Sequence, residues 1–403
     1  MFLISDNYPN KAALVCSDGS IVTYKELKEL VSDFSTYLDG RSLIFLLGSN
    51  DLASLVCYFS SLECGAVPLL LGESITNEQL NNLIDIYSPK YIFSKNALDN
   101  DAYSLEGSFE GSNVFSREEV PNTKLHDDLA LLLTTSGSTG SPKLVKLTKD
   151  NIKANTKSIS EYLKIGCNDR AITSLPFNYS YGLSVINSHL FSGGSIVLSS
   201  SSMMEEKFWK SINEYSVTSI AGVPYNYEMM LRLGIDNLDI PTIKKMTQAG
   251  GKLDYQKAKK VNDSLQLKGI DFYTMYGQTE ATARISYLPC GNLDKKPNSI
   301  GIPIPGGRLW LENEEGLKIS NSKIVGEMIY EGLNVSMGYA ESKEDLSIGD
   351  VNKGILKTGD LAYFDEEGYY FIEGRNNRFV KVFGNRISLD SLEKLVTTKG
   401  FDS

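Results

Sequence analysis

The clearest chemical signal in the sequence is a run of hydroxyl-bearing residues and glycines at 134–143, which reads TTSGSTGSPK. The apolar segment 129–133 before it has the pattern of a buried strand, and the segment 144–147 after it is typical of a returning strand. Hydroxyl groups, backbone N–H groups and the cation of Lys143 are together suited to the oxygens of a polyphosphate. The pattern predicts a phosphate-binding loop between two strands.

Two other structures are compatible with parts of this run. Its composition also fits a flexible Ser/Gly linker, but a linker does not explain the terminal Pro142-Lys143 or the apolar strand in front. A P-loop fits less well, because the glycines and the lysine miss the GxxxxGK[ST] spacing. A P-loop also leads directly into a helix, whereas a strand is expected here.

A second segment, Tyr276-Gly277-Gln278-Thr279-Glu280, joins an aromatic ring, a hydroxyl and a carboxylate within five residues. This combination suits a nucleotide with its metal ion. The segment follows an expected strand at 270–275, and open α/β sheets bind ligands at the carboxyl ends of their strands. Taken singly, Tyr276, Thr279 and Glu280 also fit ordinary roles as a core aromatic, a turn residue and a surface charge.

Together with two later segments, these motifs resemble those of the adenylate-forming superfamily, which includes acyl-CoA synthetases, peptide-synthetase adenylation domains and luciferases. The run at 134–143 resembles the phosphate loop of that family, and the segment from Tyr276 resembles its YGxTE motif. The later matches are to the TGD motif and to the hinge segment GRxDxxVKxxGxR, and they comprise Thr358-Gly359-Asp360 and Gly374-Arg375 with Lys381, Gly384 and Arg386. The resemblance extends from about the first helix to the last residue.

The resemblance implies roles in nucleotide binding. Tyr276 stacks on adenine, Thr279 contacts the α-phosphate, and Glu280 binds Mg²⁺. Asp360 holds both ribose hydroxyls, for which the two acceptor oxygens of a carboxylate are suited, and Arg375 helps to hold the ribose. Thr279, Lys143 and Glu280 are the implied catalytic residues. The implied nucleotide-binding residues are Thr135, Ser136, Gly137, Ser138, Thr139, Gly140, Lys143, Gly250, Gly251, Tyr276, Gly277, Thr279, Asp360 and Arg375.

The resemblance also implies an acyl pocket. Amino-acid-activating members usually carry an aspartate at the position that matches Asn178, where it pairs with the substrate ammonium. A neutral amide does not offset a buried ammonium, so we expect an acid without an α-amino group, an aryl or small hydroxy acid rather than a long fatty acid. The segment 248–251 resembles the substrate loop, although Gly250-Gly251 alone also fits an ordinary turn. The implied pocket residues are Asn178, Tyr179, Gly182, Val223, Gly250, Met275 and Ala281.

The hydrophobic pattern predicts the elements that position these residues. Helical periodicity and short apolar runs alternate along most of the chain, which favours parallel sheets covered on both faces. The expected helices are 24–38, 52–64, 77–86, 206–215 and 225–233, and the expected strands include 42–47, 67–71, 91–93, 195–198, 219–221 and 244–247. The pattern and the resemblance predict an α/β fold with two doubly wound, mostly parallel sheets and a small β-barrel-like subdomain.

The expected domain division follows the same pattern. Residues 1–374 form the N-terminal adenylation domain, with two α/β subdomains to about 297 and a β-rich subdomain at 298–374. Residues 375–403 form the hinge and the opening of a C-terminal domain that is largely absent, and Asn377 occupies the hinge position, where the family usually has aspartate or lysine. The bridging lysine of that domain would lie beyond Ser403, so slow adenylation by the chain alone is expected.

Composition limits the function classes. The 403 residues carry 40 Lys and Arg against 50 Asp and Glu, a net charge of −10, which argues against sequence-independent binding of nucleic acid. Five scattered cysteines without a CxxC pair, and only two histidines, disfavour a disulfide framework, a zinc site and a Ser-His-Asp triad. The sequence shows no secretory signal and no apolar run of membrane-spanning length, so a cytoplasmic protein without membrane insertion is expected.

The implied reaction joins a small carboxylic acid to ATP, giving acyl-AMP and pyrophosphate, after which a thiol of CoA or of a phosphopantetheinyl acyl carrier protein takes the acyl group. Three alternatives stay open: a protein that binds a nucleotide or acyl-adenylate without turnover, an amino-acid-activating adenylation domain, and a luciferase-like oxygenase, which rests on fold analogy alone.

The sequence yields one direct prediction about Asp360. Replacing it with alanine should weaken AMP binding by about 1.5 to 3 kcal/mol, the range for losing hydrogen bonds to a charged group. Calorimetric titration measures the loss. The unfolding temperature should barely move; a large fall in that temperature with unchanged affinity would show that Asp360 is a structural turn residue.

Overall fold

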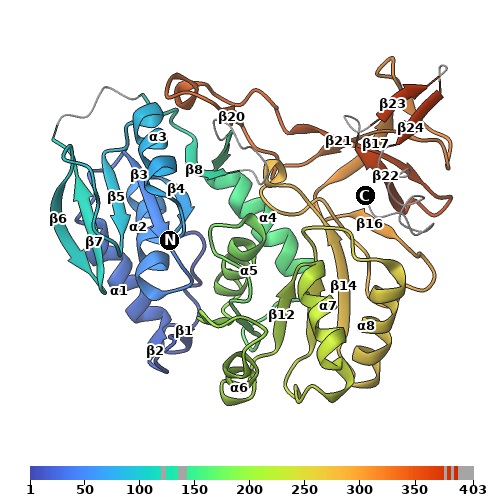
Figure 1. Ribbon diagram of the computed structural model, residues 1–403, viewed down its shortest axis with the longest axis horizontal. Coiled ribbons are helices and arrows are strands. Elements are labelled where there is room, and N and C mark those ends of the chain that lie inside the picture. The colour runs from blue at the N-terminus through green and yellow to red at the C-terminus, as the bar shows by residue number, and fades with distance from the viewer. Residues whose placement is uncertain (119–123, 135–142, 376–378, 383–384, 389–403) are drawn as a thin grey trace.

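The computed structural model describes residues 1–118, 124–134, 143–375, 379–382 and 385–388. It contains two large sheets, with helices packed between them and on their outer faces (Figure 1). Helices α4 (Lys149–Tyr162) and α5 (Ser180–Phe191) lie in the middle of the molecule, between the sheets. Ten of the twelve residues of α5 are buried, as expected of a helix that is covered on nearly all sides.

The first sheet has eight strands, and its centre is parallel while both edges are antiparallel. Its strand order is β20-β9-β8-β4-β3-β5-β7-β6. The strands are β3 (Leu43–Gly48), β4 (Val67–Gly72), β5 (Tyr91–Ser94), β6 (Ser104–Phe109), β7 (Ser112–Ser116), β8 (Leu129–Thr134), β9 (Leu144–Thr148) and β20 (Gly338–Ala340).

Helices cover both faces of this sheet because successive side chains of each strand point to opposite faces. Ile44 and Leu46 of β3 belong to the core that also holds α1 (Tyr24–Ser35) and α2 (Leu52–Cys64). Phe45 and Leu47 belong to the core on the other face, which holds α3 (Asn77–Tyr87). This is the expected arrangement of an α/β layer.

The second sheet has fourteen strands in the order β18-β17-β19-β21-β22-β16-β15-β14-β13-β12-β10-β11-β1-β2. The run from β14 to β1 is parallel, and the remaining pairings are antiparallel. The strands of the parallel part, with its edge strand, are β1 (Ala12–Val15), β2 (Ile21–Thr23), β10 (Arg170–Ile172), β11 (Ser195–Val197), β12 (Ser219–Gly222), β13 (Lys245–Gln248) and β14 (Asp271–Tyr276). Helices α6 (Glu206–Glu214), α7 (Pro224–Leu233) and α8 (Tyr255–Leu267) pack on this part through one apolar core.

The β-rich segment after residue 298 extends the second sheet and closes no barrel among the described strands, which corrects the expected barrel-like unit. The connection runs through β15, which pairs with both β14 and β16. The strands of this part are β15 (Ser286–Tyr287), β16 (Ser299–Pro303), β17 (Arg308–Glu312), β18 (Lys318–Ile319), β19 (Gly326–Glu331), β21 (Ile355–Phe364) and β22 (Tyr370–Arg375). A separate pair is formed by β23 (Phe379–Val382) and β24 (Asn385–Ser388).

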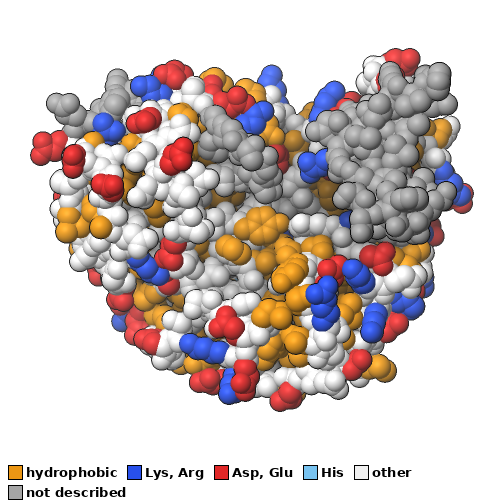
Figure 2. Space-filling model, viewed as in Figure 1, with side chains coloured by type: hydrophobic (Ala, Val, Ile, Leu, Met, Phe, Trp, Pro, Cys, Tyr) orange, Lys and Arg blue, Asp and Glu red, His pale blue; other side chains and the backbone are white. Residues whose placement is uncertain are grey.

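Short 3₁₀ helices complete the described elements: η1 (Ile235–Asn237), η2 (Thr279–Ala281) and η3 (Glu344–Ser347). Among the described helices, none is both long enough and apolar enough to cross a bilayer. On the face seen in Figure 2, acidic and basic side chains are interspersed, and they form no extended basic patch among the residues drawn in colour. The domain boundaries expected near residues 297 and 374 stay predictions.

A buried lysine ties the second half of the chain to the first sheet. Lys146 of β9 is 1% exposed, and its ammonium donates to the carbonyls of Asp345 and Ile348, each at 2.8 Å. Burial lowers the pKa of Lys146. Strand β20 pairs with β9 directly opposite it, with Gly338 facing Lys146. The segment from β20 to residue 348 is thus held on the hairpin that leads into and out of residues 135–142.

We predict that Lys146→Met lowers the free energy of unfolding by about 1 to 3 kcal/mol, because two partly buried carbonyls lose their donor while the apolar stem is kept. Urea unfolding measures the change. Lys157→Met, at an exposed position of α4, is the control and should shift stability by less than about 0.5 kcal/mol. Equal stability of the two variants would contradict the account.

Candidate functional site

A cavity of about 710 Å³ lies where the carboxyl ends of the central parallel strands meet the antiparallel extension of the same sheet. Strands β13 and β14 supply one wall, and β21 and β22 supply the other. This is the edge at which open α/β sheets bind ligands. Ten of the predicted site residues line it: Tyr179, Gly250, Gly251, Met275, Tyr276, Gly277, Thr279, Glu280, Asp360 and Arg375.

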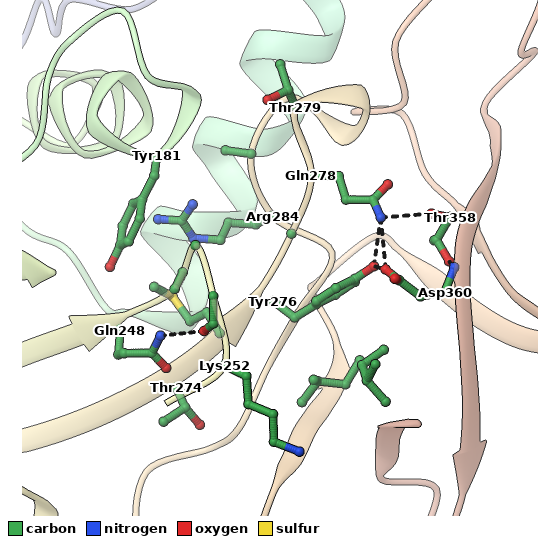
Figure 3. A pocket seen from close by; sticks show the side chains of 18 of the residues that line it. Tyr181, Gln248, Lys252, Thr274, Tyr276, Gln278, Thr279, Arg284, Thr358 and Asp360 are labelled. Atoms are coloured by element: carbon green, nitrogen blue, oxygen red, sulfur yellow. Dashed lines mark hydrogen bonds between the residues drawn. The ribbon is translucent and has the colours of Figure 1, made fainter. Parts of the chain in front are cut away.

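One end of the cavity is organised around Asp360, which is 4% exposed (Figure 3). The hydroxyl of Tyr276 donates to Asp360 Oδ2, and Gln278 Nε2 donates to the same oxygen at 3.0 Å. Gln278 also donates to the carbonyl of Thr358 at 2.9 Å. Its side-chain amide is therefore held between the end of β14 and strand β21. Tyr276 and Asp360 lie 84 residues apart in the sequence, so the sheet extension brings the two motifs together.

The charge state of this group follows from its burial. Burial raises the pKa of Asp360, and the hydroxyl of Tyr276 and the guanidinium of Arg375 oppose the rise. Arg375 stands opposite Asp360 in the β21–β22 ladder, and its Nε lies 3.4 Å from Asp360 Oδ1. Burial and the charge of Asp360 raise the pKa of Tyr276 well above its ordinary value. Tyr276 therefore keeps its proton and remains a donor to the carboxylate.

A second polar group lies around η2. The hydroxyls of Ser180 and Thr279 are 3.3 Å apart, and Tyr339 donates to Glu280 Oε1 at 2.7 Å. The ammonium of Lys143 lies 4.6 Å from the centre of the Tyr339 ring and 3.1 Å from Glu341 Oε1. Three predicted residues, Lys143, Thr279 and Glu280, thus lie in one neighbourhood, although Lys143 itself does not line the cavity.

Two glycines are explained by close packing. A Cβ on Gly277 would lie 1.8 Å from the carbonyl oxygen of Ala283, so no side chain fits there. Gly250 has φ +78°, and a Cβ on it would lie 2.5 Å from the hydroxyl of Tyr179. Gly250 is thus a turn residue that also lines the cavity, and its place in a substrate loop stays a prediction.

Four predicted pocket residues lie outside the cavity lining. Asn178 is half-buried, with its amide against Gly72 at the end of β4. Gly182 is buried within α5, and Ala281 is buried in the core beside the cavity. Val223 supports the lining from behind, with its Cγ1 3.1 Å from a Cβ built on Gly250. The charge argument based on Asn178 therefore receives no support from this arrangement.

Seven predicted residues lie outside the described part of the chain: Thr135, Ser136, Gly137, Ser138, Thr139, Gly140 and Asn377. The strands on either side of the first six are described, and β8 and β9 pair antiparallel with Thr134 opposite Leu144. This confirms the returning strand expected from the sequence.

The structure also adds residues that the motifs did not indicate. Gln278 occupies the variable position of its motif, yet it bonds to Tyr276 and Asp360. Tyr339 reaches Glu280 only because β20 pairs with a strand almost 200 residues earlier in the chain. Arg284 also lines the cavity and is 2% exposed. No local sequence signal identifies Tyr339 or Arg284.

Comparison with known proteins agrees with this geometry. The sequence profile of the family described as AMP-binding enzyme matches residues 4–340. A 2-succinylbenzoate–CoA ligase of Oceanobacillus iheyensis is 27% identical over 99% of this chain and 83% of its own length. A D-alanine–D-alanyl carrier protein ligase of Staphylococcus aureus is 27% identical over 92% of this chain and 76% of its own length.

A solved structure is similar over nearly the whole chain. O-succinylbenzoate coenzyme A synthetase from Bacillus subtilis, in complex with ATP and magnesium ion, has a TM-score of 0.77 and 22% identity, and covers 97% of this chain and 82% of its own. With the profile match, the two sheets and the cavity between β14 and β21 in agreement, the chain belongs to the AMP-binding enzyme family.

We predict a pH effect at the Tyr276–Asp360 pair. Tyr276→Phe keeps the ring but removes a hydrogen bond to ionised Asp360, so the pKa of Asp360 should rise further. If ionised Asp360 accepts from AMP, affinity falls as the pH falls through that pKa. The acid limb of AMP affinity should therefore move to higher pH in the variant. Titrations between about pH 4 and pH 8 measure it.

Tyr370→Phe is the matched control. The hydroxyl of Tyr370 donates to the carbonyl of Leu309, and Tyr370 does not line the cavity. Its acid limb should coincide with that of the unmodified protein. An unshifted acid limb in Tyr276→Phe would contradict the role given to this hydrogen bond.

Proposed function

We propose that the chain activates a small carboxylic acid with ATP, forming acyl-AMP and pyrophosphate, and that the acyl group then passes to the thiol of CoA or of a phosphopantetheinyl carrier protein. One observation carries the proposal: a single cavity, in a chain of this family, is lined by residues of separate motifs that the resemblance assigns to adenine, ribose, the α-phosphate and the metal, namely Tyr276, Asp360, Arg375, Thr279 and Glu280. The two ligase relatives, one named for CoA and one for a carrier protein, support a thiol acceptor.

In this proposal each end of the cavity has a separate task. The ring of Tyr276 supports the adenine, and Asp360, held in orientation by Tyr276 and Gln278, accepts from the ribose hydroxyls. Thr279 and Lys143 lie on the phosphate side, where charge develops as pyrophosphate leaves. No general base is required, because a carboxylic acid is already ionised at neutral pH. The chain contributes orientation of the carboxylate toward the α-phosphorus and stabilisation of charge.

The residues present fit a magnesium ion carried by ATP. Within the described part of the chain, no cluster of three or more His, Cys, Asp or Glu side chains is placed to bind a metal. Mg²⁺ commonly takes one or two protein carboxylates and completes its shell with phosphate oxygens and water. Glu280 supplies such a carboxylate, and Tyr339 orients it through Oε1. When bound, the ion would neutralise phosphate charge.

We also propose that the acid lacks an α-amino group, although Asn178 does not line the cavity. A cytoplasmic location is likewise a proposal that rests on the sequence alone. The alternative of a binding protein without turnover differs in one measurable property, the exchange of pyrophosphate into ATP.

ATP–pyrophosphate exchange tests the proposal with a panel of aryl, hydroxy, fatty and amino acids. We expect acid-dependent exchange with at least one acid that lacks an α-amino group. AMP binding without exchange for any acid would favour the binding-only alternative, and preference for an amino acid would favour an amino-acid-activating domain.

Glu280→Gln should raise the Mg²⁺ concentration for half-maximal exchange by about tenfold or more, because a neutral amide is a weaker ligand for a hard cation. Glu331→Gln, which removes a carboxylate that pairs with Arg308 outside the cavity, is the control and should leave this concentration unchanged. Equal Mg²⁺ dependence of both variants would rule out Glu280 as the metal ligand.

A further inference from the structure

Arg284 places a positive charge deep in the wall of the cavity. Its side chain is 2% exposed, and the residue lines the cavity on the side of Tyr181, away from the Tyr276–Asp360 pair (Figure 3). The guanidinium carbon lies 3.9 Å from the centre of the Tyr181 ring. A guanidinium over an aromatic face is a favourable arrangement, but the ring carries no net charge that could balance it.

No described residue supplies that balancing charge. No carboxylate in the described ranges forms an ion pair with Arg284, and its Nε has no hydrogen-bond acceptor there. Its ionisable neighbours are tyrosines. Burial raises the pKa of Tyr162 to about 12, and burial also raises the pKa of Tyr179 and of Tyr181, while Arg284 opposes the rise in each case. The three phenols are therefore neutral near pH 7.

Lys245, another buried cation of the chain, shows how a buried charge is usually balanced. The ammonium of Lys245 lies 3.2 Å from Asp169 Oδ1 and donates to the carbonyl of Leu163 at 2.9 Å. Buried charges in proteins are paired in this way because an unpaired charge in a low-dielectric interior is strongly unfavourable. Lys146 also lacks a carboxylate partner but donates to two carbonyls, whereas the Nε of Arg284, at the wall of a ligand cavity, has no acceptor among the described residues.

The backbone around Arg284 is fixed independently of any ligand. The carbonyl of Arg284 accepts from the amides of Asn155 at 3.3 Å and Asn334 at 2.9 Å. Two residues earlier, Thr282 has φ +63°, an unfavourable conformation for a β-branched residue, and its hydroxyl donates to the carbonyl of Asn334 at 2.7 Å. The fold thus holds an unpaired cation in place before a ligand arrives.

A second polar group of the lining is also unpartnered. The buried hydroxyl oxygen of Thr274 has no hydrogen-bond partner among the described residues, and Thr274 lines the same cavity. Buried polar atoms in native proteins are almost always satisfied, and those that are not call for an external partner. Thr274 is thus a second buried polar group of this wall that the described residues leave unsatisfied.

We propose that the carboxylic acid bound in this cavity carries a second carboxylate, which pairs with Arg284 while the first faces Thr279 and the α-phosphate. The proposal rests on the proposed function, because it assumes that the cavity holds an acid beside a nucleotide. A guanidinium matches a carboxylate with two parallel hydrogen bonds, and the burial of Arg284 strengthens that pairing. A monocarboxylic acid of similar shape would leave the guanidinium unpaired.

Equilibrium binding of matched acids to the AMP-saturated protein tests the proposal. Calorimetric titration compares succinate with butyrate, and isophthalate with benzoate. We expect at least one dicarboxylate to bind about tenfold or more tightly than its monocarboxylate, the discrimination of one charge-assisted pair. Arg284→Gln should abolish that preference, so that each dicarboxylate and its monocarboxylate bind with similar affinity. Arg284→Lys, which keeps the charge but lacks the fork, should retain part of the preference.

Thermal unfolding separates loss of binding from loss of folding. The unfolding temperature of ligand-free Arg284→Gln should not fall, because the variant removes an unpaired charge. Lys245→Gln, which breaks a paired one, should lower it. If Arg284→Gln does not fold, Arg284→Lys decides: an unchanged dicarboxylate preference in that variant contradicts the proposal.

The remaining outcomes are distinct. Absence of AMP binding would contradict the proposed function itself. AMP binding with dicarboxylates no tighter than monocarboxylates, or with no measurable dicarboxylate binding, would overturn the assignment of Arg284 and leave the proposed function standing. An equal loss of affinity for both acids in Arg284→Gln would show that Arg284 binds the reacting carboxylate. That result would also overturn the proposal.

Discussion

The candidate site depends on the hydrogen bond between Tyr276 and Asp360. This bond can form because the parallel part of the second sheet continues into an antiparallel extension. Tyr276 ends the last parallel strand of the second sheet, whereas Asp360 lies in the antiparallel extension. The cavity exists because this extension turns its strands β21 and β22 toward the carboxyl ends of β13 and β14. Burial makes the carboxylate costly, and the donors of Tyr276 and Gln278 with the guanidinium of Arg375 offset that cost.

A second constraint joins the first sheet to the same cavity. Strand β20 returns to β9 late in the chain, and Lys146 holds the segment after it in place. This pairing brings Tyr339 to Glu280 and places its ring beside Lys143. The group expected to meet phosphate and metal is therefore assembled from both sheets, and the group expected to meet adenine and ribose from one.

The sequence predicts the central elements well because their signals are local. The helix at Leu52–Cys64 matches its expected bounds, since its buried residues are apolar or small and Asp51 caps its N-terminus. The two strands expected at 129–133 and 144–147 are confirmed by the antiparallel β8–β9 pair. The expected barrel-like unit is not confirmed. Long-range pairing decides whether short strands close into a barrel or extend a neighbouring sheet, and here β15 joins them to the second sheet.

The candidate site shows the same difference between local sequence signals and long-range contacts. Motif residues such as Tyr276 and Asp360 line the cavity, and their roles in nucleotide binding stay predictions. Tyr339 and Arg284 are recognised only from burial and partners that the folded chain defines. Asn178 shows the converse: a plausible position in a motif does not place its side chain in the cavity.

A crystal structure of the protein with AMP tests the central claim most directly. The account predicts adenine against the ring of Tyr276 and both ribose hydroxyls within hydrogen-bonding distance of Asp360, about 2.5 to 3.0 Å. AMP bound elsewhere, or bound in this cavity with its ribose turned away from Asp360, would contradict it.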